Sequence, residues 1–171
     1  HEMFGLDYVI FRPHNVYGEN QNIGDKYRNV IGIFMNQIMR GESLTIFGDG
    51  QQTRAFSYID DVAIPIARSV KTDLAYNKVF NIGADQPYTV NELAQVIGNS
   101  MNVTPKLNYL QARNEVMHAY SDHARAHEVF GKGSGVSLEE GIRRMAAWAN
   151  EVGARQSQEF GEIEILEKLP Q

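Results

Sequence analysis

Three arginines in this sequence stand where a phosphate group could be held. Arg12, Arg54 and Arg113 fall at the ends of extended segments or in loops, whereas Arg143 lies on the face of a predicted helix. Ligands of α/β proteins collect at the carboxyl ends of parallel strands, and a guanidinium there can bind two phosphate oxygens. Each arginine could instead pair with a nearby carboxylate. The three together favour a phosphate site.

Two asparagines and one short strand supply further candidate binding residues. Asn15 and Asn29 could bind sugar hydroxyls or phosphate, or they could form an Asx-turn and a helix cap. The run from Leu44 to Phe47 could frame a flat base, with its main chain reading the base edge. The same run could equally be a plain core strand. Both interpretations of each candidate stay open at this point.

Histidines and glycines give weaker signals. His14 lies in the turn after the first extended segment, where a cofactor ring could contact it. His123 and His127 are four residues apart, but Ala124 stands where the H-E-x-x-H metalloprotease motif requires Glu. The glycines around Lys132 lack the preceding strand and the terminal Lys-Ser of a phosphate loop. We therefore predict neither a metal site nor a loop of that kind.

Extended and helical segments alternate along the chain. The extended segments are expected at 6–11, 44–47, 54–58, 79–82 and 106–110, and the helices at 30–39, 60–70, 89–101, 122–130 and 137–152. Segment 6–11 shows no polar alternation, which predicts a strand buried on both faces. Asp60 is a predicted N-cap, and Thr89 and Ser137 open predicted capping boxes. The alternation predicts an α/β architecture with parallel pairing.

Composition bounds the class of protein. The chain has 171 residues, 43% of them hydrophobic and 22% charged, which is typical of one soluble globular domain. A net charge of -5 argues against a nucleic-acid surface. The sequence has no cysteine, no apolar run long enough for a membrane span and no signal-peptide pattern, which fits a cytoplasmic protein. Residues 1–155 are expected to form the domain, and 156–171 a tail with a strand-like run from Ile163 to Leu166.

Several longer motifs, taken in order, are similar to those of one enzyme family. They are Arg-Pro-His-Asn-Val-Tyr-Gly at 12–18, Leu-Thr-Ile-Phe-Gly-Asp-Gly at 44–50, Thr-Arg-Ala-Phe-Ser-Tyr-Ile-Asp-Asp-Val at 53–62 and Ser-Leu-Glu-Glu-Gly-Ile at 137–142. From about Leu6 to Trp148 the chain resembles the NAD-dependent nucleotide-sugar epimerase/dehydratase family of extended short-chain dehydrogenases/reductases, with UDP-glucose 4-epimerases as the closest type. The resemblance implies the C-terminal part of a Rossmann-like parallel sheet plus the small mixed α/β substrate-binding domain.

The resemblance also implies site residues. Those that would contact a UDP-sugar substrate are Asn15, Asn29, Thr45, Ile46, Phe47, Arg54, Arg113 and Glu115. Residues 45–47 would line the uracil pocket, Arg54 and Arg113 would clamp the diphosphate, and Glu115 would reach the ribose hydroxyls. His14 would lie near the nicotinamide of NAD. The family usually has Arg-x-Gly-Asp where this chain has Arg113-Asn114-Glu115, which is one residue shorter.

Family members oxidise a sugar carbon transiently with NAD and use a Tyr-x-x-x-Lys pair as the base. Neither that pair nor a Gly-x-x-Gly-x-x-Gly dinucleotide loop occurs in this sequence. We therefore expect a substrate-binding half that is inactive alone and whose partner is an N-terminal NAD-binding half. The alternatives are a dehydratase or decarboxylase fragment, a non-catalytic nucleotide-sugar binding module, or a structural remnant. Because the edge at 6–11 would normally pair with that other half, we also expect self-association.

Overall fold

The computed structural model describes residues 1–25, 29–133 and 135–156. The helices are α1 (Val30–Met39), α2 (Ile59–Ser69), the short 3-10 helix η1 (Asp73–Ala75), α3 (Val90–Ser100), α4 (Ala124–Phe130) and α5 (Leu138–Val152). The strands are β1 (Val9–Pro13), β2 (Val16–Tyr17), β3 (Leu44–Phe47), β4 (Thr53–Ala55), β5 (Ser57–Tyr58), β6 (Lys78–Ile82), β7 (Pro87–Thr89), β8 (Leu107–Leu110) and β9 (His118–Ala119). No helix in the described ranges is long and apolar enough to cross a membrane. The strand-like run predicted from Ile163 to Leu166 lies outside these ranges.

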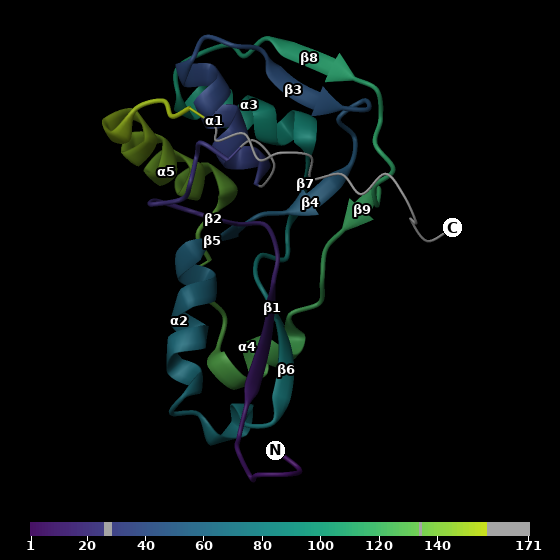
Figure 1. The fold of residues 1–171 in the computed structure, drawn as a ribbon, viewed down its shortest axis with the longest axis vertical. Coiled ribbons are helices and arrows are strands. Elements are labelled where there is room, and N and C mark those ends of the chain that lie inside the picture. The colour runs from purple at the N-terminus through teal and green to yellow at the C-terminus, as the bar shows by residue number, and fades with distance from the viewer. Residues whose placement is uncertain (26–28, 134, 157–171) are drawn as a thin grey trace.

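Mostly parallel pairing joins segments that are far apart in the sequence. Strand β1 pairs with β6, β2 with β5 and β3 with β8, all in parallel. Strand β4 lies between β7, which is antiparallel, and β9, which is parallel. Figure 1 shows an elongated molecule with β1, β6, α2 and α4 at one end and α1, α3, α5, β3 and β8 at the other. The predicted α/β architecture with parallel pairing is confirmed.

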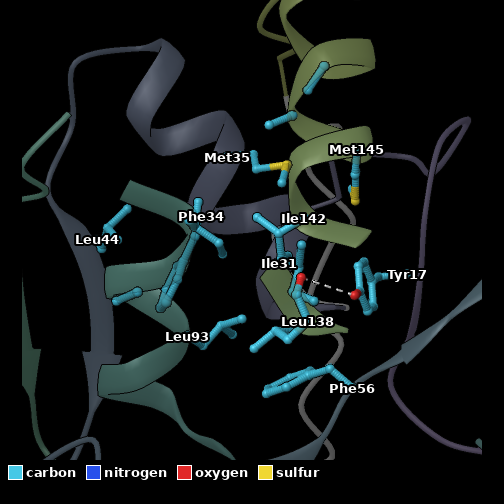
Figure 2. Packing of buried hydrophobic residues seen from close by; sticks show 14 of the residues in the cluster. Tyr17, Ile31, Phe34, Met35, Leu44, Phe56, Leu93, Leu138, Ile142 and Met145 are labelled. Carbon is cyan, nitrogen blue, oxygen red and sulfur yellow. Dashed lines mark hydrogen bonds between the residues drawn. The ribbon is translucent and has the colours of Figure 1, made fainter. Parts of the chain in front are cut away.

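The larger hydrophobic core lies among α1, α3 and α5. Helix α1 buries Ile31, Phe34 and Met35 at helical spacing, and α5 adds Ile142 and Met145 from the opposite side (Figure 2). Burying one side chain of this size contributes about 1.5–3 kcal/mol. Because α1 and α3 also contact each other and α1 packs on β3, this core fixes the strand that carries three of the candidate binding residues.

A smaller core of three aromatic rings joins β1, β6 and α4. The ring centroids of Phe11 and Phe80 are 5.8 Å apart. The ring centroid of Phe130 lies 5.7 Å from that of Phe11 and 5.1 Å from that of Phe80. Successive strand side chains point to opposite faces, so the neighbouring Ile10 faces away and is 46% exposed. The prediction of a strand at 6–11 buried on both faces was therefore wrong, because the strand begins at Val9 and only one of its faces is covered by the described chain.

Helix caps agree with the predictions at one position of three. Thr89 and Glu92 form the complete capping box at the start of α3. Ser137 caps α5 by accepting a hydrogen bond from the backbone of Glu140, but the Glu140 carboxylate turns to Arg143 and Arg144 instead of reaching back. The prediction of Asp60 as an N-cap was wrong, since α2 begins one residue earlier and Asp60 lies inside its first turn.

The short strands were the hardest elements to predict. The extended stretch expected at 54–58 is two strands, β4 and β5, separated by the buried Phe56. Strands β2, β7 and β9 have two or three residues each and were not predicted. A run of that length is too short to show a periodic pattern. These strands nevertheless bring the candidate residues together.

We expect the Thr89→Ala substitution to lower the free energy of unfolding by about 1 kcal/mol, because it removes the side chain that caps α3. Thr104→Ala, at an exposed position outside any helix or strand, is the matched control and is expected to change it by less than about 0.5 kcal/mol. Urea denaturation monitored by circular dichroism measures both. Equal effects of the two substitutions would contradict the assignment of the cap.

Candidate functional site

A cavity of about 270 Å³ opens where β3 ends and where the chain returns from β8 toward β9. Its lining residues are Phe47, Gly48, Asp49, Gln52, Ala112, Arg113, Glu115 and Met117. The parallel register pairs Phe47 with Leu110, so the ends of both strands lie side by side. Gly48 and Gly50 then reverse the chain with φ values of 76° and 74°, a conformation that favours glycine. Strand pairing and this turn therefore create the cavity.

An aromatic ring and a guanidinium form one wall of the cavity. The Cζ atom of Arg113 lies 3.5 Å from the centroid of the Phe47 ring. Such a stack contributes about 0.5–1 kcal/mol at an exposed site. Within the described residues, no carboxylate lies within ion-pair distance of Arg113. The wall therefore combines a flat apolar surface with a positive charge that no protein carboxylate in the described part neutralises.

A second guanidinium is held beside the cavity by several hydrogen bonds. Arg54 donates to the carbonyl oxygens of Thr53 at 2.8 Å and Met117 at 3.1 Å, and to Oε2 of Glu115 at 2.8 Å. The Arg54 side chain is only 17% exposed, whereas that of Glu115 is 41% exposed. These bonds fix Arg54 firmly, and the more exposed Glu115 is the partner that a ligand can reach.

Gln52 joins the two walls. Its Nε2 donates to the carbonyl oxygen of Phe47 at 2.9 Å and to Oε1 of Glu115 at 3.3 Å. One side chain therefore ties the end of β3 to the carboxylate on the opposite segment. Neither Gln52 nor Met117 was predicted as a site residue. The sequence offers no signal for Gln52, because its partners are defined only by the folded arrangement of segments 63 positions apart.

The remaining residues of β3 take different positions. The hydroxyl oxygen of Thr45 accepts a hydrogen bond from Nε2 of Gln37 at 3.0 Å. The backbone N–H of Thr45 donates a hydrogen bond to Oε1 of Gln37 at 3.2 Å. The side chain of Ile46 is buried in the larger core. Only the main chain of Ile46 could therefore contact a ligand, whereas the side chain of Phe47 faces the cavity.

Both candidate asparagines have structural roles. Asn29 caps α1, because its side-chain oxygen accepts from the Ile31 backbone and its amide donates to the Val16 carbonyl. Asn15 adopts a left-handed backbone with φ 43°, and its amide donates to the Ala55 carbonyl at 3.0 Å. This hydrogen bond holds the Asn15 side chain against β4 at Ala55, the residue that follows Arg54. The helix-cap interpretation of Asn29 is confirmed, and a ligand contact would come in addition to it.

His14 lies apart from the cavity, just beyond the carboxyl ends of β1 and β6. These strands end side by side at Pro13 and Ile82, and the His14 ring packs against Gly83. Its two ring nitrogens are buried and have no hydrogen-bond partner among the described residues. Burial, followed by the neighbouring His123, lowers the pKa of His14 below its ordinary value. The ring is therefore biased toward its neutral form.

The structure thus brings four predicted residues together, whereas the side chains of the other predicted residues do not line this cavity. Phe47, Arg113 and Glu115 line one cavity, and Arg54 reaches it through Glu115. The shortened segment between Arg113 and Glu115 still delivers both side chains to the same cavity. A stacking surface, two guanidiniums and a carboxylate are a set that suits a ligand with a planar ring, hydroxyl groups and a polyphosphate.

Comparisons with known proteins show which sequences and structures this chain is similar to. A sequence model of the NAD dependent epimerase/dehydratase family matches residues 1–83. A Methanocaldococcus jannaschii protein provisionally named as a UDP-glucose 4-epimerase is 35% identical over 147 residues, which are 85% of this chain. UDP-glucuronic acid decarboxylase 5 of Arabidopsis thaliana is 31% identical over 85% of this chain. The crystal structure of Thermotoga maritima UDP-glucose 4-epimerase with UDP-glucose superposes with a TM-score of 0.80 at 32% identity, over 88% of this chain.

The chain spans about half the length of the relatives that it matches. The aligned region covers 47% of the Methanocaldococcus protein, 42% of the plant decarboxylase and 48% of the Thermotoga epimerase. The similarity therefore concerns one part of those proteins.

We expect Glu115→Gln to change the free energy of unfolding by less than about 1 kcal/mol, because the pair that it breaks is partly exposed and solvent-screened. Glu42→Gln, which breaks the equally short Arg40–Glu42 pair on the surface, is the matched control. Urea denaturation of the three proteins gives the comparison. A loss above about 3 kcal/mol for Glu115→Gln alone would mean that the network serves the fold rather than a ligand.

Proposed function

This chain belongs to the NAD-dependent epimerase/dehydratase family, and from that premise we propose that residues 1–155 are the substrate-binding part of a nucleotide-sugar epimerase. Its ligand is a UDP-sugar, and the complete enzyme transiently oxidises a sugar carbon such as C4 with NAD as its cofactor. The observation that carries the proposal is the cavity lined by the Phe47–Arg113 stack and by Glu115, which pairs with Arg54 beside it.

The nucleotide fits the cavity by the chemistry of its walls. The uracil ring stacks on the surface formed by Phe47 and Arg113, beside the main chain of Thr45 and Ile46. The diphosphate accepts hydrogen bonds from the guanidiniums of Arg54 and Arg113, because two positive groups complement two negative phosphates. The ribose hydroxyls donate to the carboxylate of Glu115. Binding is therefore an exchange in which Glu115 leaves Arg54 for the ribose and phosphate oxygens replace it.

In this proposal the sugar lies near Asn15 and Asn29, and the cofactor lies near His14. Asn15, linked to β4 beside Arg54, is placed to contact the diphosphate or the sugar, and Asn29 to contact the sugar nucleotide. His14, at the carboxyl ends of two parallel strands and with buried unpartnered ring nitrogens, fits one edge of a nicotinamide site. When bound, NAD supplies the hydride acceptor and donor of the reaction.

Turnover requires groups that this chain does not supply. No tyrosine in the sequence is followed four residues later by a lysine, so a Tyr-x-x-x-Lys base must come from elsewhere. A tyrosine acts as a base near neutral pH only when neighbouring positive charge lowers its pKa. Burial instead raises the pKa of Tyr17, and the nearby tyrosine Tyr58 raises it further. We propose that the chain alone binds substrate without converting it.

An NAD-binding half would also cover the exposed apolar surface at one end of the molecule. Ile10 on β1, Ile64 and Ile66 on α2, and Val70 directly after α2 are all exposed, which is unusual for side chains of this size. A further strand and helix packed against β1 and α2 would bury them. In their absence a second copy of the chain is expected to do so. We place the protein in the cytoplasm, consistent with a sequence that contains no cysteine.

A nucleotide-sugar decarboxylase is the second candidate, because the similarity to the plant UDP-glucuronic acid decarboxylase covers the same residues. The two functions share the nucleotide site and differ at the sugar. Loss of CO₂ from UDP-glucuronate by the complete enzyme would favour the decarboxylase. A third possibility, a non-catalytic nucleotide-sugar binding module, predicts the same binding to the chain and no conversion by any longer form of the protein.

We expect UDP and UDP-glucose to bind the purified chain, and Arg54→Ala to weaken both about 10- to 100-fold, as loss of charge-assisted hydrogen bonds commonly does. Isothermal titration calorimetry measures the affinities. Arg143→Ala, on the exposed face of α5, is the control and is expected to leave them unchanged. No binding to a chain that circular dichroism shows to be folded would contradict the proposal.

We expect the isolated chain to self-associate and Ile10→Lys to reduce the associated fraction, because a charge on an open strand face opposes pairing with another copy. Light scattering coupled to size-exclusion chromatography measures the mass over a range of concentrations. Glu2→Lys, at the exposed N-terminus, is the control for added charge. A monomer at all concentrations would exclude association through this edge.

A further inference from the structure

A buried pair of imidazoles lies outside the nucleotide cavity. The rings of His14 and His123 are stacked, with centroids 5.0 Å apart and planes 14° from parallel. His123 Nδ1 lies 2.6 Å from Oδ1 of Asp85, close enough for a strong hydrogen bond. The three residues come from three separate segments, after β1, after β6 and directly before α4.

The pair is buried on the His123 side and open on the Asp85 side. The His123 side chain is 1% exposed, whereas that of Asp85 is 67% exposed. His123 Nε2 and both nitrogens of His14 have no partner among the described residues. His127 is the other imidazole nearby, with its ring 6.3 Å from His123 and tilted by 49°. A chain of contacts therefore runs from the surface carboxylate through His123 to His14.

We propose that Asp85 and His123 are positioning residues, which hold the His14 ring in place and keep it uncharged at the cofactor side of the site. The orientation follows from the contacts. Asp85 fixes the His123 ring through Nδ1, and the fixed ring presents its flat face to His14. The functional meaning of the position of His14 rests on the proposed function, because only that places a nicotinamide beside it.

The charge follows from the same arrangement. Two protonated imidazoles 5.0 Å apart in a buried place would repel each other, so the pair accommodates one positive charge more readily than two. Asp85 contacts His123 and not His14, so this charge partition places the carboxylate on the His123 ring alone. Burial adds to this cost, because it removes the charged form of His14 from water, and it outweighs the opposite effects of the Ala84 backbone and Asp85. Its lowered pKa, caused first by burial and then by His123, agrees with this partition.

A neutral His14 suits the proposed neighbour. Oxidised nicotinamide is a cation, and an imidazolium in contact with it would oppose binding of the oxidised cofactor. A neutral imidazole offers a flat ring without that repulsion. The pair thereby separates two tasks, since His123 contacts the carboxylate of Asp85 and His14 provides the uncharged surface.

Proton NMR of the histidine ring resonances of the full chain tests the charge partition without any ligand. His14 is expected to titrate with a midpoint below the ordinary histidine value of about 6.5. His123→Phe keeps a flat ring but removes the like charge, so it is expected to move the His14 midpoint upward. His127→Phe, the control, is expected to leave it in place. An unchanged midpoint in His123→Phe would overturn the partition, because burial alone would then account for the shift.

Asp85→Asn tests the positioning at an exposed side chain whose replacement spares the core. At pH 8, above its lowered pKa, the His14 ring is neutral, and its stack with His123 gives its ring protons a characteristic shift. Loss of the carboxylate is expected to move these resonances toward those of an unstructured histidine, and an unchanged spectrum would overturn the positioning role. Circular dichroism checks that each variant is folded. Because no nucleotide is present, failure here is distinct from failure of UDP titration, which would instead refute the proposed function.

Discussion

Strand β4 is the constraint on which the site depends. It has only three residues, yet it must pair with β7 on one edge and β9 on the other while accepting a bond from Asn15. The pairing with β9 draws the segment after β8 across the end of β3, which closes the cavity. Arg54, in the middle of β4, is thereby brought to Glu115, 61 residues later in the chain. The pairing of β4 with β9 therefore positions Arg54 and Glu115 at the cavity.

The proposed exchange of partners in the cavity rests on a difference in how firmly its two charged side chains are held. Arg54 is held by two main-chain carbonyls and keeps its place when Glu115 moves, whereas Glu115 is tied only by Gln52 and Arg54 among the described residues. In the proposed function, the phosphate groups of a nucleotide would pair with Arg54 and its hydroxyl groups with Glu115. The imidazole pair is also held from one side, because Asp85 contacts the His123 ring, which in turn stacks on the His14 ring.

Sequence patterns predicted the parts of the fold that depend on local periodicity. The helices and the strands β3, β6 and β8 follow from apolar spacing, and the α3 cap follows from Thr89 and Glu92. The two- and three-residue strands are too short to show a periodic pattern. The predicted capping box at Ser137 is incomplete, because the Glu140 carboxylate accepts hydrogen bonds from arginine side chains and not from the Ser137 backbone. The family resemblance named the candidate binding residues, but Gln52 in the cavity and His123 outside it make contacts across 63 and 109 positions that no local pattern encodes.

The most direct test of the central claim is a crystal structure of this chain with UDP bound. The account predicts the uracil ring against Phe47 and Arg113, phosphate oxygens within hydrogen-bond distance of Arg54, and Glu115 moved from Arg54 to the ribose. UDP bound elsewhere, or bound in this cavity with the Arg54–Glu115 pair intact, would contradict it.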